Sequence, residues 1–134
     1  MQTAKEIFLE LLKPDGRPER ILKQYEALHM CLYDPINVYL RGNRKRGSVS
    51  KDRWGTTISF PEDAPGATPL HGDGLTVCPD ITRWREFVHA PDIAANCTEG
   101  WAECRAKARA AAGDDRLVAG FMGTGIFEQC HFLM

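Results

Sequence analysis

The sequence predicts an α/β protein in which parallel strands are joined by helices. Residues 97–112 form an alanine-rich segment with helical spacing, and Gly113 follows it as a helix stop. Residues 116–121 then form a short apolar run, which is typical of a buried strand. This run leads through glycines into apolar residues with helical spacing from Ile126 onward. Helix, strand and helix in this order are the repeat unit of parallel α/β proteins.

The glycine turn after the predicted strand is the first candidate for a functional site. Its glycines let the backbone turn sharply and approach a ligand closely. A helix that begins there directs N–H groups and its positive dipole end toward the carboxyl edge of the strand, where α/β proteins build their sites. The turn lacks the third glycine of a dinucleotide fingerprint and the Gly-Lys-Ser/Thr of a phosphate-binding loop. The predicted substrate contacts in this region are Gly123, Thr124, Gly125 and Phe127.

Polar residues at predicted turns and strand ends extend the candidate site. Glu128 lies in the first turn of the last predicted helix, where it either serves as an acid or base facing a cleft or only complements the helix dipole. Glu26 and Asp52 are the other candidate acid–base residues, and Trp54 and His29 are candidate substrate contacts. Each of these four also has a structural interpretation, as a solvated or packed side chain. The sequence contains no metal-binding motif, so we predict no metal ligands.

The part of the chain before residue 97 offers fewer signals. Residues 3–6 form a capping box, which predicts a helix with an apolar stripe from Ile7 to Leu12. Residues 18–30 fit both a strand and a helix, because their apolar positions agree with both periods. The remaining expectations are a basic loop over 41–50, a strand over 56–60, an irregular excursion over 61–74 and a short helix over 80–88.

Composition restricts the protein class. The 134 residues are enough for one domain, and their net charge of -1 provides no general attraction for nucleic acid or anionic membrane. No apolar run is long enough to span a bilayer. The five cysteines never form a C-x-x-C motif and follow no signal peptide, which indicates reduced thiols in the cytoplasm.

The order of these segments resembles the N-terminal portion of the uroporphyrinogen decarboxylase superfamily. The main likenesses are an Asp-x-Trp-Gly turn at residues 52–55 that leads a strand and a Gly-Phe-x-Gly strand end at residues 120–123. The resemblance implies a TIM-type (β/α)8 barrel of about 250 residues with its site at the carboxyl ends of the strands. Residues 1–134 would then form an N-terminal helical extension and the first strands of a single domain. Such a piece is expected to stop within a helix, to be inactive alone and to associate through open sheet edges.

The superfamily includes the decarboxylase of porphyrin biosynthesis and cobalamin-dependent methyltransferases. True decarboxylases carry an Arg-Gln-Ala-Gly-Arg stretch whose arginines hold substrate carboxylates, whereas residues 23–27 here read Lys-Gln-Tyr-Glu-Ala. The resemblance therefore implies the methyltransferase branch, with a small-molecule substrate and a corrinoid protein as partner. It also implies a zinc ion held by His and Cys ligands late in the full-length protein. Adjacent Cys130 and His131 point apart on a helix and do not replace those ligands.

Two alternatives stay open at this stage. The first is a true uroporphyrinogen decarboxylase. The second is a non-enzymatic α/β module that forms homo-oligomers through an open sheet edge.

Overall fold

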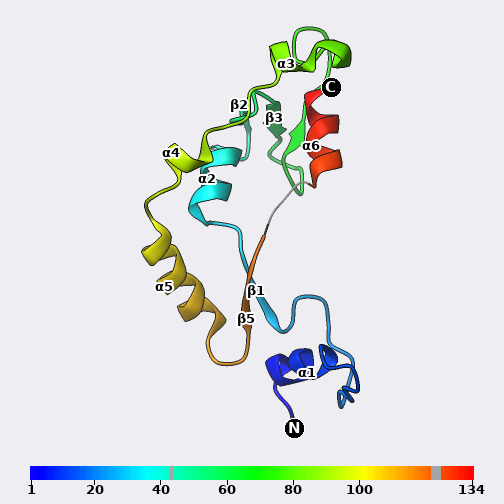
Figure 1. Cartoon of the computed structure of the whole chain (residues 1–134), viewed down its shortest axis with the longest axis vertical. Coiled ribbons are helices and arrows are strands. Elements are labelled where there is room, and N and C mark those ends of the chain that lie inside the picture. Colours follow the sequence, from blue (N-terminus) through cyan, green and yellow to red (C-terminus); the bar gives the residue numbers. More distant parts are fainter. Residues whose placement is uncertain (43, 122–124) are drawn as a thin grey trace. The chain divides into compact units, whose positions relative to one another are not determined.

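A computed structural model describes residues 1–42, 44–121 and 125–134, and the chain divides into two compact units (Figure 1). Unit 1 combines residues 1–34 with residues 99–121. Unit 2 contains residues 35–98 and the C-terminal segment, which is described from Gly125 onward. The described residues mix helices with two small sheets and form no closed barrel.

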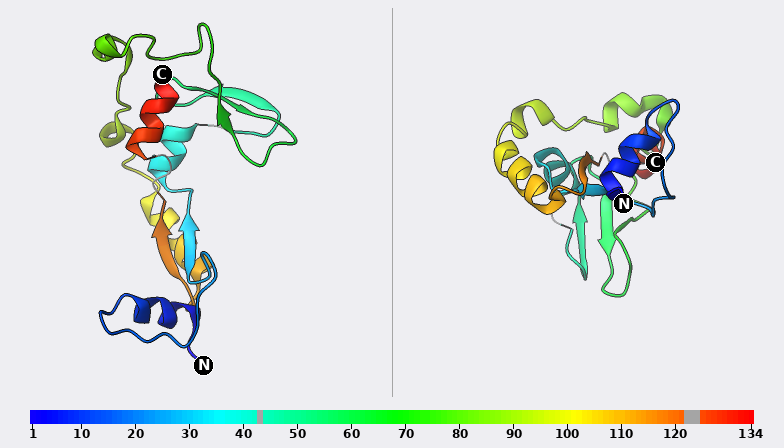
Figure 2. Two further views of the ribbon diagram at one scale, coloured as in Figure 1. Left: turned by 90° about the vertical axis from the view of Figure 1, so that its right-hand side faces the viewer. Right: turned by 90° about the horizontal axis from the view of Figure 1, so that it is seen from below.

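Unit 1 is built on a parallel pair of strands. Strand β1 (Leu28–Cys31) lies beside β5 (Leu117–Gly120), with Leu28 opposite Leu117 and Cys31 opposite Gly120. Helix α5 (Trp101–Ala112) packs against both strands (Figures 1 and 2). The strand expected at residues 116–121 is thus confirmed, and its partner is parallel to it.

Strand β5 is less buried than its apolar sequence predicts. Leu117 and Ala119 are half-buried, but the Val118 side chain is 44% exposed. The expectation of a buried strand is wrong because, in the described part of the chain, β5 pairs with β1 alone, and a two-stranded sheet covers its residues poorly.

The ambiguous segment 18–30 is neither a continuous strand nor a helix. Only its last residues enter β1, and residues 24–27 form a turn. Tyr25 adopts a left-handed backbone conformation with a φ of 61°, which interrupts both regular structures. Its carbonyl oxygen accepts a hydrogen bond of 3.0 Å from the amide of Leu28, so the turn leads directly into β1.

The capped N-terminal helix is confirmed as α1 (Ala4–Leu11). The Thr3 side chain accepts a hydrogen bond from the amide of Glu6, and the Glu6 carboxylate accepts one from the amide of Thr3. Ile7 is fully buried, but Leu11 and Leu12 are exposed, so the buried stripe is narrower than expected. The helix ends at Leu11 and therefore presents less than three turns for packing.

Helix α5 begins later than its sequence suggests. Gly100, with a φ of 79°, precedes the first helical residue, Trp101. Cys97 instead closes the short helix α4 (Ile93–Asn96) in unit 2, so the expected start of the alanine-rich helix at residue 97 is wrong. Gly113 is confirmed as the C-terminal cap, with a φ of 61° that favours glycine.

Unit 2 contains an antiparallel sheet in the order β2–β3–β4. Strand β3 (Thr57–Phe60) confirms the strand expected at residues 56–60, whereas β2 (Ser48–Lys51) lies where the end of a basic loop was expected. Pairing with β3, which places Ser48 opposite Phe60, outweighs the weak strand signal of the β2 residues. Strand β4 (Thr68–Pro69) is a two-residue interruption of the irregular excursion.

Short helices complete unit 2. They are α2 (Pro35–Arg41), the 3-10 turn η1 (Ile81–Arg83), α3 (Trp84–Phe87), α4 and α6 (Ile126–Leu133). Turn η1 and α3 confirm the short helix expected over residues 80–88, and α6 confirms the helix after the glycine turn. Among the described residues, no helix combines the length and apolar character that crossing a bilayer requires.

Candidate functional site

The carboxyl end of β1 brings reactive side chains together within unit 1. Side chains two residues apart on a strand share a face, so His29 and Cys31 point to the same side of β1, and Tyr33 follows two positions later. Helix α5 contributes Cys104 and Lys107, which contact Cys31 and Tyr33 respectively. We call these five residues the β1–α5 cluster.

His29 and Tyr33 form a hydrogen-bonded pair in this cluster. The His29 Nε2 and Tyr33 Oη atoms are 2.9 Å apart, and the Lys107 ammonium lies 4.4 Å from the centre of the Tyr33 ring. Burial is the main cause that raises the pKa of Tyr33, and proximity to the Cys31 and Cys104 thiols adds to it. The phenol therefore keeps its proton, and the His29 tautomer decides which of the two groups donates the hydrogen bond. A pair of this kind can give or take a proton.

The two thiols of the β1–α5 cluster are in contact, with their Sγ atoms 3.6 Å apart. Cys31 is buried, and Cys104 is partly exposed. Burial raises the pKa of the Cys104 thiol, as do its hydrogen bond with Cys31 and the nearby charge of Asp34, while Lys107 lowers it. Cys104 is consequently a protonated thiol near neutral pH rather than a ready nucleophile.

Glu26, an expected acid–base residue, also lies in unit 1 but is committed to local contacts. Its carboxylate binds the Arg20 guanidinium, with Oε1 2.5 Å from Nη2, and accepts a hydrogen bond from the Lys23 amide. The hydrogen bond from Arg20 is the main cause that lowers the pKa of Glu26 to about 2. The Glu26 carboxylate stays ionised at neutral pH and stabilises a turn. These properties favour a structural role for Glu26 over a role in proton transfer.

Asp52 lies in unit 2 and organises the turn between β2 and β3. Its Oδ1 atom accepts hydrogen bonds of 2.9 and 3.0 Å from the amides of Trp54 and Thr56, and its side chain is only 5% exposed. Arg44 approaches the other oxygen at 3.8 Å. Burial raises the pKa of Asp52, and these hydrogen bonds and the Arg44 charge oppose that rise. Gly55 completes the turn with a φ of 86°, so the Asp-x-Trp-Gly spacing has a local structural cause.

The region of the glycine turn is described from Gly125, the residue that precedes α6. The expected substrate contacts Gly123 and Thr124 lie outside the described residues. Phe127 is 87% exposed, and Glu128 is exposed in the first helical turn, where its charge complements the helix dipole. The structure thus places Glu26 and His29 in unit 1, and Asp52, Trp54, Gly125, Phe127 and Glu128 in unit 2.

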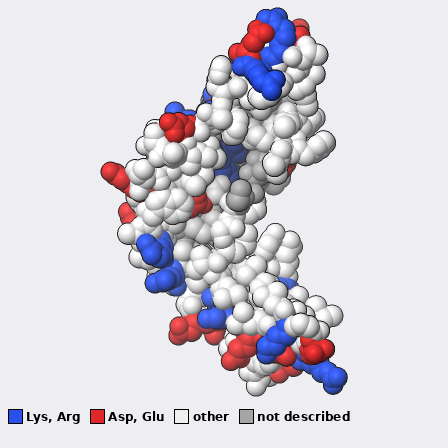
Figure 3. All heavy atoms as spheres, in the orientation of Figure 1, with Lys and Arg blue, Asp and Glu red and all other residues white. Residues whose placement is uncertain are grey.

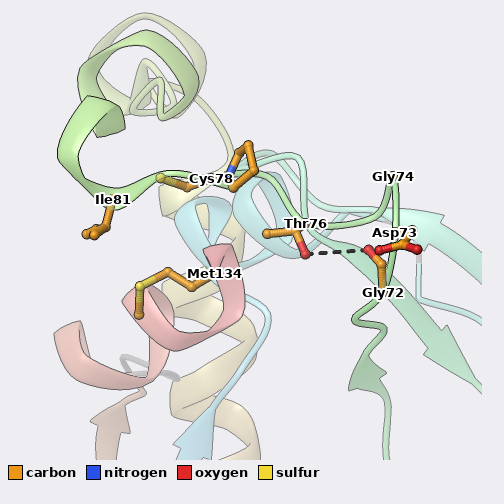
Figure 4. Close-up of a pocket in the computed structure, with 8 residues that line it drawn as sticks. Gly72, Asp73, Gly74, Thr76, Cys78, Ile81 and Met134 are labelled. Carbon is orange, nitrogen blue, oxygen red and sulfur yellow. Dashed lines mark hydrogen bonds between the residues drawn. The ribbon is translucent and has the colours of Figure 1, made fainter.

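A separate pocket of about 730 Å³ in unit 2 lies between residues 72–81 and the C-terminal Met134 (Figure 4). Cys78, Ile81 and Met134 give it apolar walls, whereas Asp73 and Thr76 line its polar part. The Thr76 hydroxyl points toward Gly72, whose carbonyl oxygen lies 3.5 Å away. Among the described residues, none of those expected to form the site lines this pocket.

The surface shows no concentration of one charge on the face that is drawn, and the described side chains form no metal site. On the face drawn in Figure 3, basic and acidic side chains are mixed and most of the surface is uncharged. No three His, Cys, Asp or Glu side chains in the described ranges 1–42, 44–121 and 125–134 are grouped in a way that could hold a metal ion. These residues therefore do not fit the zinc ion that the family resemblance implies for a full-length protein.

The chain matches no protein-family model, no curated protein and no solved structure. The candidate site therefore rests on the contacts within this structure alone. Sequence analysis identified His29 but missed Tyr33, Lys107 and the contact between Cys31 and Cys104. Two signals in the sequence could have indicated this cluster. His29, Cys31 and Tyr33 alternate along and just beyond a strand. Cys104 and Lys107 lie one helical turn apart on the alanine-rich helix.

Proposed function

We propose that this chain is the N-terminal part of an enzyme of the uroporphyrinogen decarboxylase superfamily, and that the carboxyl end of β1 contributes to its active-site rim. The observation that carries the proposal is the parallel pairing of β1 and β5 beside α5, with His29 on β1 in contact with Tyr33 just beyond the carboxyl end of this strand. Parallel strands covered by helices place their functional residues at that end. The fold we propose is the first portion of a (β/α)8 barrel.

In this proposal, the β1–α5 cluster handles a proton and a polar group of a small-molecule substrate. His29 and Tyr33 exchange a proton with the substrate through their shared hydrogen bond. Lys107, which is exposed, adds a positive charge beside the Tyr33 ring. This arrangement suits a substrate with one polar or anionic group rather than many.

The methyltransferase branch is supported by the turn that precedes β1. Arg20 lies three residues before the stretch that corresponds to the decarboxylase arginines, and its guanidinium is already paired with Glu26. An octacarboxylate porphyrinogen would therefore lack a free counter-charge from this residue. We assign zinc and the corrinoid partner to the full-length protein, because the resemblance places the zinc ligands late in that protein. Five free thiols support a cytoplasmic location.

A self-associating, non-enzymatic module is the second candidate function. It is favoured by the two-stranded sheet of unit 1, in which β5 presents the 44% exposed Val118. Open edges of this kind pair readily with another chain. Homo-oligomer formation is expected under both proposals, because a piece of a barrel exposes the same edges.

Two measurements on the 134-residue chain test the proposal. Sedimentation velocity over a range of concentrations is expected to show association, and a cooperatively folded monomer at all concentrations would count against a barrel portion. Titration with uroporphyrin I, followed by porphyrin fluorescence, is expected to show no saturable binding. Saturable binding that an Arg20→Ala variant weakens would instead support the decarboxylase alternative.

A further inference from the structure

The contact between Cys31 and Cys104 points to a function that the proposed activity does not use. We propose that these two cysteines form a reversible intramolecular disulfide, driven by exchange with a low-molecular-weight disulfide such as oxidised glutathione. The cross-link would join the carboxyl end of β1 to the first turn of α5, between residues 73 positions apart in the sequence.

The geometry of unit 1 favours this pairing over other pairings. The two Sγ atoms are 3.6 Å apart, so an approach of about 1.5 Å gives the length of a disulfide bond. Cys104 lies in the first turn of α5, directly after Gly100, whose φ of 79° marks a break in the helical backbone. The remaining cysteines, Cys78, Cys97 and Cys130, belong to unit 2.

The unequal exposure of the two thiols sets the order of the exchange. Cys104, the more accessible thiol, loses its proton and attacks one sulfur of oxidised glutathione, which releases one glutathione thiolate and leaves a mixed disulfide on Cys104. Cys31 then loses its proton and attacks the Cys104 sulfur, which releases the second glutathione. Two protein thiols are oxidised, and one glutathione disulfide is reduced to two glutathione molecules.

The groups around the sulfur atoms make this a slow, pH-dependent switch. Tyr33 and Asp34 come from the β1 side, and Lys107 comes from α5. Because burial and Cys31 raise the pKa of Cys104, the attacking thiolate is scarce at neutral pH and becomes more abundant as pH rises. The rate of exchange is therefore expected to increase with pH above neutrality.

Incubation of the chain in glutathione buffers of increasing oxidised fraction, followed by alkylation of free thiols, tests the proposal. The intact monomer is expected to take up three alkyl groups instead of five and no glutathione, and reduction before alkylation should restore all five. Trypsin leaves Cys97 and Cys104 in one peptide, so digestion with both trypsin and a glutamate-specific protease is needed. Cleavage after Glu99 then separates them, and the expected cross-linked product joins the peptides of Cys31 and Cys104.

Single-cysteine variants provide matched controls. Cys31→Ser is expected to accumulate the mixed disulfide on Cys104, whereas Cys130→Ser should form the cross-link as the natural chain does. Peptide mapping of the natural chain keeps the test valid if a variant fails to fold. Exclusive formation of intermolecular disulfides, or accumulation of the glutathione adduct on Cys104 in the natural chain, would overturn the proposal.

Discussion

The Nε2 atom of His29 on β1 lies 2.9 Å from the Oη atom of Tyr33, and both residues belong to unit 1. Removal of the hydroxyl in Tyr33→Phe is expected to break this contact and to shift the ¹⁵N resonance of His29 Nε2. The ring nitrogens of the other three histidines should be unaffected. Nitrogen-detected NMR measures the change, and Tyr39→Phe in α2 is the matched control. An unchanged His29 signal would contradict the hydrogen bond.

The carboxylate of Glu26 is expected to stay ionised down to a pH of about 2. Because folding lowers its pKa from the ordinary value of 4.5, its contribution to stability is fully present above that value and is lost as the pH falls toward about 2. Carbon-detected NMR titration of the carboxyl group measures the pKa. Arg20→Ala should raise it toward the ordinary value, and a normal titration in the natural chain would refute the ion pair.

Asp52 is expected to matter as a hydrogen-bond acceptor more than as a charge. Asp52→Ala leaves the amides of Trp54 and Thr56 without their acceptor and should lower the free energy of unfolding by about 1–3 kcal/mol. Asp52→Asn retains an acceptor oxygen and should cost less. Urea denaturation compares the two variants, and an equal loss for both would assign the effect to the ion pair with Arg44.

The Asp52 variants also have a pH signature. Burial raises the pKa of Asp52, so the protonated form is favoured by folding. The stabilisation is fully present below the carboxyl pKa of the unfolded chain and declines as the pH rises through the folded-state value. Asp52→Asn should lack this decline when urea denaturation is repeated across the acidic range.

Thr56 is expected to tolerate the loss of its hydroxyl. Its side chain is only 1% exposed, and its Oγ1 atom has no hydrogen-bond partner among the described residues. Thr56→Val keeps the shape and removes the unsatisfied polar group, so the free energy of unfolding should rise by roughly 1 kcal/mol. Urea denaturation measures this change. Thr56→Ser, which retains the hydroxyl, is the control and should not stabilise the chain.

Gly16 is expected to be intolerant of any side chain. A Cβ atom at this position would overlap the backbone carbonyl oxygen of Glu10, which cannot move without opening the end of α1. Gly16→Ala should therefore lower the melting temperature measured by circular dichroism. Gly66→Ala, at a position where the added atom meets nothing within 4 Å, is the matched control and should have little effect.

Local signals predicted the elements better than they predicted the site. The capping box at Thr3, the helix stop at Gly113 and the strand that became β5 depend on neighbouring residues, and all were identified from the sequence. The β1–α5 cluster depends on contacts between residues far apart in the chain, so only His29 was anticipated. The burial of β5 was overestimated for the same reason, because cover comes from other segments.

The interleaving of the two units affects how the chain folds. Strand β1 and its partner β5 are separated by most of the sequence, and the intervening residues 35–98 belong to unit 2. Bringing such distant strands together costs chain entropy and slows folding. During synthesis, the hydrogen-bonding edge of β1 therefore stays open until β5 (Leu117–Gly120) has left the ribosome, and in that interval the nascent chain is exposed to mispairing or chaperone capture.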